Sequence, residues 1–437
     1  MKDALLRTVS ASLQASGLDH KCRITVGLSG GIDSVVLLHL LRRGLRISPN
    51  YLLAIHVNHQ ISVHAASWAA QCRRYCRELG VRLKVAKVDV RRGNSTEAAA
   101  RDARYGVFAS FGSDVIALAH NRDDQAETVL LQLLRGAGPR GLAGMPSYRP
   151  GVPSLWRPLL DTPRSSIETY ARDHRLVWVE DDSNEDRTYL RNFVRHDVLP
   201  LIGRKVAGAS AVLARAARLQ AEASDLLDAL AKQDIGGAVS DHSIEVSALQ
   251  QLPSHRARNA LRYFLRCRDV TMPDAVRLEE ALRQACGARE DARVCVDIGE
   301  VELRRFRGSL HIVRPLPPIK PGFEFAFRGT ADVPLQRLGG VLRFESSVGE
   351  GIAAKWLRQP MTLRVRGGGE GLRLSDDGPR RTVRNLLQEA GLPPWQRERL
   401  PMLYLGDRLV AVPGLGVDEQ FQPAARNRGW QPVWTCE

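Results

Sequence analysis

The sequence predicts an α/β fold in which a doubly wound parallel sheet is followed by a helical arm and smaller α+β domains. Short apolar stretches with strand character alternate with helical stretches as far as residue 134, and a parallel sheet with crossover helices requires this alternation. A second observation is the Ala- and Leu-rich stretch over 206–230, which predicts one long helix. Beyond it, helical and strand patterns mix in short segments, which favours separate α+β domains.

The period of the apolar residues sets the order of elements in the first part. Leu5, Val9 and Leu13 share one face of a predicted helix near the N-terminus. The further helices are expected over 35–41, 65–79, 96–111, 123–134 and 164–174, and the strands over 24–28, 51–57, 81–88 and 115–119. Ligands of doubly wound sheets bind at the carboxyl ends of the strands, so polar residues that follow a strand are the candidate site residues.

A glycine-rich turn follows the first strand and opens the next helix. Its sequence is Ser29-Gly30-Gly31-Ile32-Asp33-Ser34. Glycines let backbone N–H groups approach an oxyanion, and the first turn of a helix adds unpaired donors and the positive end of its dipole. The two serines add hydroxyl donors, whereas Asp33 would repel a bare phosphate and so indicates a metal ion or an amine beside it. An ordinary serine-capped turn is the alternative interpretation.

Polar residues also follow the second strand and line the helix expected over 96–111. His56, Asn58 and His59 end the strand, where groups close to an adenosine would be needed. On the helix, Arg101 is suited to triphosphate oxygens, because a guanidinium group can bind them in a bidentate manner. A polar strand end without function and a surface ladder of salt bridges are the alternatives.

A longer polar run follows the fourth strand and enters the helix after it. It is His120-Asn121-Arg122-Asp123-Asp124-Gln125-Ala126-Glu127-Thr128. Asp123 or Asp124 lies three or four residues before Glu127, so two carboxylates can face one point. That arrangement suits Mg²⁺ or an ammonium group. Acidic capping of the helix is the alternative, and it accounts for only one of these carboxylates.

The composition is that of a globular protein with an anionic partner. The chain has 437 residues, 44% hydrophobic and 25% charged, with a net charge of +15. This charge favours nucleic acid, although a general preference for Arg in the genome would also produce it. We expect no membrane span and no signal peptide, because no apolar run is long enough. The seven cysteines form no Cys-x-x-Cys pair, which favours reduced thiols in the cytoplasm.

Together these motifs resemble the PP-loop family of N-type ATP pyrophosphatases and, within it, the tRNA(Ile)-lysidine synthases. The turn over 29–34 is similar to the pyrophosphate loop of the larger family. Similarity to the lysidine synthases lies in the run over 120–128, the segment Arg135-Gly-Ala-Gly-Pro-Arg-Gly141-Leu142, the triplet Asp182-Ser-Asn184 and the spacing Tyr189-x-Arg191-Asn192-x-x-Arg195. Asn58 and Ser62 depart from the commonest pattern of that family.

The resemblance implies a Rossmann-like catalytic domain over 1–205, a helical linker over 206–235, and α+β tRNA-binding domains over 236–315 and 316–437, the last with its core from about 355. It implies a ligase that uses ATP and Mg²⁺ to join free L-lysine to C2 of the wobble cytidine of tRNA(Ile) with a CAU anticodon. The reaction passes through an adenylated cytidine and changes the codon read from AUG to AUA. A homodimer is compatible with the sequence.

Roles at the site follow from this resemblance together with the chemistry of the side chains. The ATP-binding set is Ser29, Gly30, Gly31, Ile32, Asp33, Ser34 and His56. The catalytic set is Asp33, Asp124, Glu127, Arg101 and His120, and the expected Mg²⁺ ligands are Asp33 and Asp124. In this scheme Arg101 clamps the phosphates and His120 faces the α phosphate. Asp124 and Glu127 hold the lysine amine and accept its proton.

Basic residues in the last two domains are the candidates for contact with tRNA. They are Arg256, Arg258, Arg262 and Arg266 on one expected helix, and Arg364, Arg366, Arg373, Arg380, Arg381 and Arg384 near Trp395. Arginines beside an aromatic side chain suit RNA, although a solvated basic face is the alternative.

Two other functions remain open from the sequence. A tRNA thiolase of the same superfamily would need catalytic cysteines or a cluster-binding Cys-x-x-Cys, which the sequence lacks. A non-catalytic RNA-binding protein belongs to a different class, and the intact loop and acidic helix argue against it.

Overall fold

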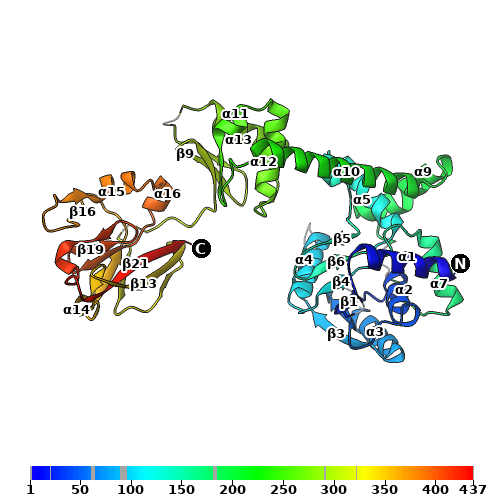
Figure 1. Ribbon diagram of the computed structural model, residues 1–437. Helices are drawn as coiled ribbons and strands as arrows, with labels where there is room; N and C mark the ends of the chain where they lie inside the picture. The colour runs from blue at the N-terminus through cyan, green and yellow to red at the C-terminus, as the bar shows by residue number, and fades with distance from the viewer. Residues whose placement is uncertain are drawn as a thin grey trace. The chain divides into compact units, whose positions relative to one another are not determined.

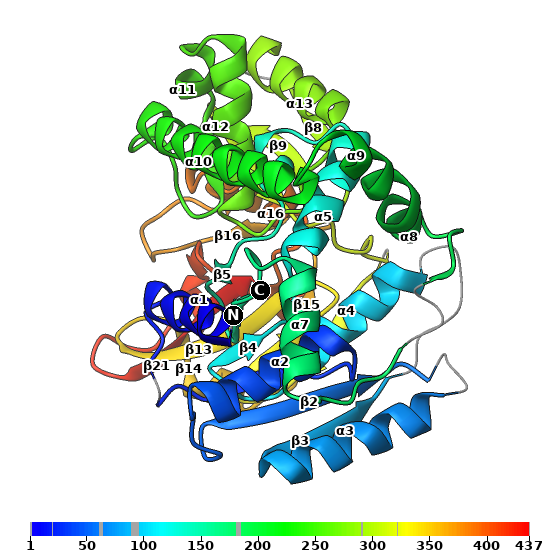
Figure 2. The ribbon, with the colours of Figure 1, turned by 90° about the vertical axis from the view of Figure 1, so that its right-hand side faces the viewer.

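The computed structural model describes residues 2–19, 21–60, 64–88, 96–180, 185–289, 292–320 and 322–436. They form two compact units, Met1–Ala229 and Leu230–Glu437, each with hydrophobic cores of its own. The ribbon of both units appears in two views in Figures 1 and 2. Among the described residues, no helix combines the length and the apolar character that a membrane span needs.

A six-stranded sheet forms the centre of the first unit, in the order β3-β2-β1-β4-β6-β5. All neighbours are parallel except β5, which runs antiparallel to β6. The strands are β1 (Ile24–Gly27), β2 (Leu52–Asn58), β3 (Arg82–Lys87), β4 (Val115–Ala117), β5 (Tyr148–Arg149) and β6 (Ser154–Trp156). The predicted parallel sheet is therefore confirmed.

Helices cover both faces of this sheet. They are α1 (Lys2–Ala15), α2 (Ile32–His39), α3 (Ala65–Leu79), α4 (Thr96–Ala109), α5 (Arg122–Leu134), α6 (Pro139–Leu142) and α7 (Arg164–Asp173). Side chains of α1, α2, α3 and α7 share a core with Val115 and Ala117 of β4. Ile116, which points to the other face, packs with Phe108 of α4. The alternation along β4 therefore explains why the sheet is doubly wound.

The position of β1 decides where the site lies. From β1 the chain passes to β2 and β3 on one side, and β4 and β6 lie on the other. The strand order thus reverses between the neighbours β1 and β4, and the loops that follow these two strands diverge. Open α/β sheets bind their ligands in the crevice between two such loops. The glycine-rich turn follows β1, and the run that begins at His120 follows β4. The helix after the turn begins at Ile32, earlier than expected, and continues into a π-helical turn over Leu40–Gly44.

A helical arm begins in the first unit, and its last helix continues into the second unit at Leu230. It contains α8 (Leu190–Phe193), a π-helical turn (Val194–Val198), α9 (Leu199–Lys205) and α10 (Ala209–Ile235). Near the start of α10, Ser210 donates a hydrogen bond of 2.5 Å to the Asp123 carboxylate of α5. The arm is therefore attached to the helix that carries the acidic run.

The second unit contains small antiparallel sheets. A four-stranded sheet in the order β7-β10-β9-β8 packs with three helices. Its elements are β7 (Ser243–Glu245), α11 (Val246–Gln250), α12 (Ser254–Arg266), α13 (Ala275–Gly287), β8 (Cys295–Asp297), β9 (Glu302–Phe306) and β10 (Ser309–Val313).

The remaining strands form a five-stranded sheet, a second four-stranded sheet and a two-stranded ribbon. The strands are β11 (Glu324–Phe327), β12 (Val333–Leu335), β13 (Gly340–Val348), β14 (Ile352–Ala353), β15 (Met361–Arg364), β16 (Gly371–Leu372), β17 (Arg381–Thr382), β18 (Met402–Leu405), β19 (Arg408–Val412), β20 (Gly416–Val417) and β21 (Arg428–Cys436). The helices are α14 (Ala354–Leu357), α15 (Val383–Glu389), α16 (Pro394–Arg397) and a 3-10 turn (Glu419–Phe421). The predicted α+β character of this part is confirmed.

Trp156 provides a test of how the first unit is held together. It is fully buried at the end of β6, and its indole N–H donates a hydrogen bond of 2.9 Å to Ser12 of α1. We expect Trp156→Ala to lower the free energy of unfolding of this unit by about 3–5 kcal/mol, and Trp156→Phe to lower it less. Urea denaturation with and without ATP identifies the transition of the unit that binds the nucleotide. A change below about 1 kcal/mol for the alanine variant would contradict this account.

Candidate active site

The glycine-rich turn adopts a conformation that requires glycine at position 30. Gly30 has a φ of +96°, and its carbonyl accepts a hydrogen bond of 2.9 Å from the Val179 N–H. A Cβ at this position would lie 3.2 Å from the Cys72 sulfur and 3.5 Å from the Val179 side chain. Both the backbone conformation and the lack of space therefore exclude a larger residue.

The two serines of the turn close a ring of hydrogen bonds. The Gly31 N–H donates to the Ser29 hydroxyl at 3.2 Å, and the Gly30 N–H donates to the Ser34 hydroxyl at 3.2 Å. The Ser34 hydroxyl donates to the Gly31 carbonyl at 2.9 Å. The side chain of Ile32 is buried, so this residue contributes its backbone N–H at the start of α2, where helices have no internal acceptors. The turn is thus a preorganised anion cradle.

His56 holds the residue that precedes this cradle. Its ring is buried, and its Nδ1–H donates a hydrogen bond of 2.8 Å to the Leu28 carbonyl, immediately before the turn. Burial lowers the pKa of His56, so the ring is neutral at physiological pH. The histidine that was predicted to bind ATP thus bonds to the backbone immediately before the loop and fixes the position at which the loop begins.

Asn121 joins the loop after β4 to the helix after β1. Its side-chain oxygen caps α5 by accepting hydrogen bonds from the N–H groups of Asp123 and Asp124 at 2.9 and 3.1 Å. Its amide nitrogen donates to the Asp33 carboxylate at 3.0 Å. Burial, followed by the charge of Asp124, raises the pKa of Asp33. Asp124, the other predicted metal ligand, therefore lies close enough to Asp33 to oppose its ionisation.

The two aspartates that the sequence left undecided have different partners. Asp123 accepts hydrogen bonds from the Arg164 N–H at 3.0 Å and from Ser210, so it connects α5 with α7 and α10. Asp124 accepts the Asn121 N–H at 3.0 Å with one oxygen and faces the site with the other. Asp123 is thus a structural anchor, and Asp124 is the carboxylate beside Asp33.

Two arginines of the arm pair with the acidic helix and complete a four-charge cluster. Arg195 contacts Glu127 at 2.5 Å and Asp124 at 2.9 Å, and Arg191 contacts the same two carboxylates at 2.9 and 3.4 Å. The Glu127 side chain is only 1% exposed. Although burial acts in the opposite direction, the hydrogen bond and charge of Glu127 raise the pKa of Arg195. The cluster offers charges of both signs at the edge of the sheet.

His120 lies next to this cluster and is held as a neutral ring. Arg157, which is 3% exposed, donates a hydrogen bond of 3.3 Å from Nε to the His120 Nδ1. Nδ1 is therefore the acceptor nitrogen, and the proton of the neutral ring lies on Nε2. Burial lowers the pKa of His120 to about 3, with the positive charge of Arg157 acting in the same direction. His120 is thus suited to donate a hydrogen bond rather than to carry charge.

Arg101 belongs to a separate arginine cluster around Tyr105. The guanidinium groups of Arg101, Arg104 and Arg149 lie 5.2, 5.9 and 5.7 Å from the centre of the Tyr105 ring. Arg101 itself is exposed. Burial, then the charge of Arg149 and then that of Arg101 lower the pKa of Arg157. Because Arg157 binds His120, this cluster lies on the His120 side of the site.

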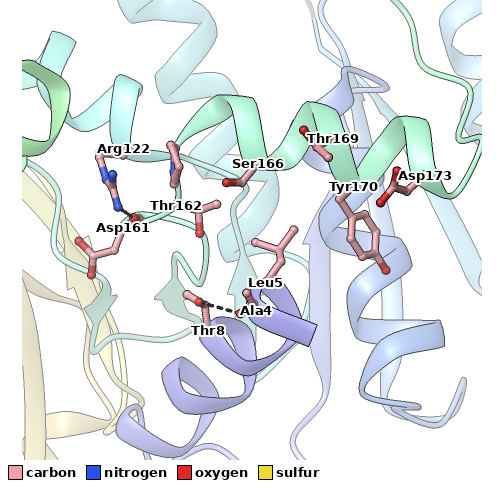
Figure 3. A pocket seen from close by; sticks show the side chains of 11 residues that line it. Ala4, Leu5, Thr8, Arg122, Asp161, Thr162, Ser166, Thr169, Tyr170 and Asp173 are labelled. Atoms are coloured by element: carbon pink, nitrogen blue, oxygen red, sulfur yellow. Dashed lines mark hydrogen bonds between the residues drawn. The ribbon is translucent and has the colours of Figure 1, made fainter. Parts of the chain in front are cut away.

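A cavity of about 180 Å³ lies between α1 and α7, apart from the residues described above (Figure 3). Leu5, Thr8, Ser166 and Tyr170 are among its lining residues, and Arg122 closes one end with a hydrogen bond to the Asp161 carbonyl. None of the residues predicted to bind ATP or to act in catalysis lines it. The predicted residues instead gather around the N-terminal ends of α2 and α5.

Some residues of the candidate site escaped prediction. Asn121 and Arg157 had no assigned role, although an Asn-x-x-Asp capping pattern before an apolar helix was a usable signal for Asn121. Arg191 was noted only through its spacing with Arg195, which does not indicate a partner 64 residues away. The triplet that includes Asp182 and Asn184 lies outside the described residues.

Matches to known families cover most of the chain. Residues 4–202 match the family model described as PP-loop domain, residues 245–311 the TilS substrate binding domain, and residues 361–434 the TilS substrate C-terminal domain. The PP-loop match contains both the glycine-rich turn and the acidic helix.

Whole proteins match over nearly their full length. The chain is 39% identical over 419 residues to the tRNA(Ile)-lysidine synthase of Nitrosomonas europaea, covering 94% of this chain and 92% of that protein. It is 42% identical over 417 residues to that of Chromobacterium violaceum, covering 94% of each. With that of Ralstonia nicotianae the identity is 39% over 428 residues, covering 94% and 92%. The chain belongs to the tRNA(Ile)-lysidine synthase family.

Proposed function

We propose that this chain converts the wobble cytidine of tRNA(Ile) with a CAU anticodon to lysidine, using ATP and free L-lysine. The observation that carries the proposal is the hydrogen bond between Asn121 and Asp33, which brings the anion cradle beside the four-charge cluster. One part of the site suits a nucleotide and the other a zwitterionic amino acid. A ligase that adenylates one substrate and then joins an amine to it needs both parts.

In the first step, O2 of the cytosine attacks the α phosphate of ATP, and pyrophosphate leaves. The cradle over 29–34 binds the departing pyrophosphate through N–H groups at the start of α2, and the Gly30 and Gly31 N–H groups exchange the serine oxygens for phosphate oxygens. His120 donates its Nε2–H toward the α phosphate, where negative charge develops. Arg101 neutralises the outer phosphates from the cluster around Tyr105. His56 acts through the loop, because it holds the Leu28 carbonyl.

The residues fit a Mg²⁺ ion that accompanies the phosphates. Asp33 is a half-buried carboxylate with one oxygen bonded to Asn121, and Asp124 lies close enough to raise its pKa. Mg²⁺ that is shared with phosphates and water needs only one or two carboxylates. Asp33 would hold the ion, and Asp124 would contribute its charge, since both Asp124 oxygens already accept hydrogen bonds. Bound there, the ion would neutralise charge on the phosphates.

In the second step, the lysine ε-amine attacks C2 of the cytosine, and AMP departs with O2. Free lysine carries ammonium groups and a carboxylate, and the cluster of Asp124, Glu127, Arg191 and Arg195 presents both opposite charges. The carboxylates attract the amine and accept its proton, while the guanidinium groups bind the amino-acid carboxylate. Binding of lysine therefore requires the four charges to exchange partners.

The second unit supplies surfaces for the remainder of the tRNA, since one base cannot provide enough identity. Not every basic residue there is available to RNA. On α12, Arg256 pairs with the buried Asp234 side chain, and Arg258 pairs with Glu279 at 2.7 Å. Ion pairs also engage Arg364, Arg373 and Arg381 of the set near Trp395, so we assign the phosphate contacts of this unit to neither set of arginines as a whole.

Nucleoside analysis tests the proposed function directly. The full chain is incubated with ATP, labelled lysine and an isoleucine tRNA that carries a CAU anticodon. We expect label in a modified cytidine and pyrophosphate release that depends on tRNA. Release of pyrophosphate without incorporation of lysine would point to another member of the PP-loop superfamily.

Asp33→Asn tests the role of this carboxylate in the first step. Asparagine can still accept the hydrogen bond from Asn121 but carries no charge. We expect tRNA-dependent pyrophosphate release to fall by about a hundredfold or more, because a group that organises the phosphate charge is lost. Asp173→Asn, at an exposed carboxylate of α7, is the matched control and should remain close to normal. Normal release by a folded Asp33→Asn protein would remove Asp33 from the mechanism.

Glu127→Gln tests the second step. The amide preserves the shape but removes the charge that pairs with Arg191 and Arg195. We expect a higher apparent KM for lysine and a lysidine-forming step that slows more than adenylation. Single-turnover assays that follow the adenylated tRNA and lysidine separately provide the measurement. Glu168→Gln on the exposed face of α7 is the control. Equal slowing of both steps, with unchanged lysine dependence, would assign Glu127 to ATP instead.

His120 predicts a pH dependence of stability. Its folded pKa of about 3 lies below the value of 6.5 for an ordinary histidine, so the folded state binds fewer protons. Stability is therefore lost as the pH falls from about 6.5 toward 3, and by pH 5 the loss is about 1–2 kcal/mol. His120→Gln should lack this contribution. Urea midpoints for both proteins at pH 7 and pH 5 provide the measurement, and an identical pH dependence would refute the assignment of a neutral ring.

A further inference from the structure

The cavity between α1 and α7 lies apart from the residues that the proposed reaction uses (Figure 3). Its volume is about 180 Å³. A cavity of ~150 Å³ can hold benzene, so this one suits a ligand of about six to ten non-hydrogen atoms. Ala4 and Leu5 of α1 provide apolar surface in its wall. The size thus fits a free amino acid and excludes a nucleotide.

A buried hydroxyl group in the wall of the cavity has no partner. Thr162 is only 4% exposed, and no group among the described residues forms a hydrogen bond with its hydroxyl. Thr8 and Thr169 also line the cavity, but their hydroxyls donate to carbonyls of their own helices at 3.1 and 2.8 Å. A buried polar group without a partner is unfavourable, and a ligand that bonds to it removes this cost.

Charges of both signs lie at one end of the cavity. Arg122 is half-buried, and its guanidinium group donates a hydrogen bond to the Asp161 carbonyl. Within the part of the chain that the structure describes, neither Arg122 nor the Asp161 carboxylate has an ion-pair partner. This end of the cavity is therefore suited to a molecule that carries one charge of each sign.

We propose that this cavity binds a free α-amino acid with an apolar side chain. The α-carboxylate accepts hydrogen bonds from Arg122 and from the Thr162 hydroxyl, and the α-ammonium group pairs with Asp161. The side chain packs against the apolar surface of α1. A phosphate ion is a poorer ligand because Asp161 repels it, and a diamine is a poorer ligand because Arg122 repels it.

The proposed ligand contacts two residues that fix the start of the acidic helix. Arg122 is the first residue of α5, and its backbone N–H donates a hydrogen bond of 2.9 Å to the Thr162 carbonyl. The site therefore borders the active site through the backbone of α5 but shares no side chain with it. Binding there needs neither ATP nor tRNA, so it can be measured independently of the proposed reaction.

Isothermal titration calorimetry of the full chain with L-leucine tests the proposal. Lysine is avoided as a probe, because the active site is expected to bind it as well. We expect one saturable site per chain with a dissociation constant of about 1 mM or lower. L-Leucinamide lacks the carboxylate and 4-methylpentanoate lacks the ammonium group, so each should bind at least about tenfold more weakly. The absence of leucine binding at about 10 mM would overturn the proposal, as would equally tight binding of either analogue.

Substitutions in the wall locate the bound leucine. Thr162→Val keeps the shape of the side chain but removes its hydroxyl, and Arg122→Gln removes the positive charge. We expect each to raise the dissociation constant for leucine about tenfold or more. The melting temperature of Thr162→Val should not fall, because the hydroxyl has no partner among the described residues of the free protein. Unchanged leucine binding by both variants would refute the assignment.

Two control variants separate this cavity from its surroundings. Thr169→Val should bind leucine normally, because the hydroxyl that it removes is already bonded within α7. Glu127→Gln should also bind leucine normally, because Glu127 belongs to the active site and does not line the cavity. Weaker binding of leucine by Glu127→Gln would place the ligand in the active site and overturn the proposal.

Discussion

The side chain of Asn121 is the constraint on which the geometry of the site depends. One amide group caps α5 through its oxygen and holds the Asp33 carboxylate of α2 through its nitrogen. Both elements begin at carboxyl ends of neighbouring strands, so this one residue fixes the distance between the anion cradle and the acidic helix. A carboxylate in place of the amide could cap the helix, but it would repel Asp33 instead of binding it.

The sequence predicted the local parts of the site well, because those parts depend on short-range rules. The glycines, the serines and the start of α2 follow from turn chemistry and from the apolar run that succeeds them. The assignment of Asp124 rather than Asp123 came from the family resemblance and not from these rules, since neighbouring positions on a helix differ by about 100° in direction and only the tertiary partners decide which one faces the site. The parallel sheet was predictable for the same reason as the turn, from a regular alternation of patterns.

The long-range parts of the site could not be predicted in this way. Arg157 follows a buried strand and reaches back to His120, and Arg195 reaches the acidic helix across 68 residues of chain. No periodic pattern contains such pairings. The arginines that are free to bind RNA could not be predicted either, because a basic sequence does not reveal which arginines form ion pairs within the protein. Arg256 is one example, since its partner Asp234 is almost wholly buried.

The hydrogen bond between Ser210 and Asp123 has a mechanical consequence. Asp123 binds the start of α10 on one side and the backbone of α7 on the other, and the next residue is Asp124. A movement of the arm would therefore act on Asp123, the residue next to the Asp124 carboxylate that faces the site. A displacement of the long helix would change the orientation of the side chains of the candidate site, because the arm is bonded to the residue next to the cap of α5.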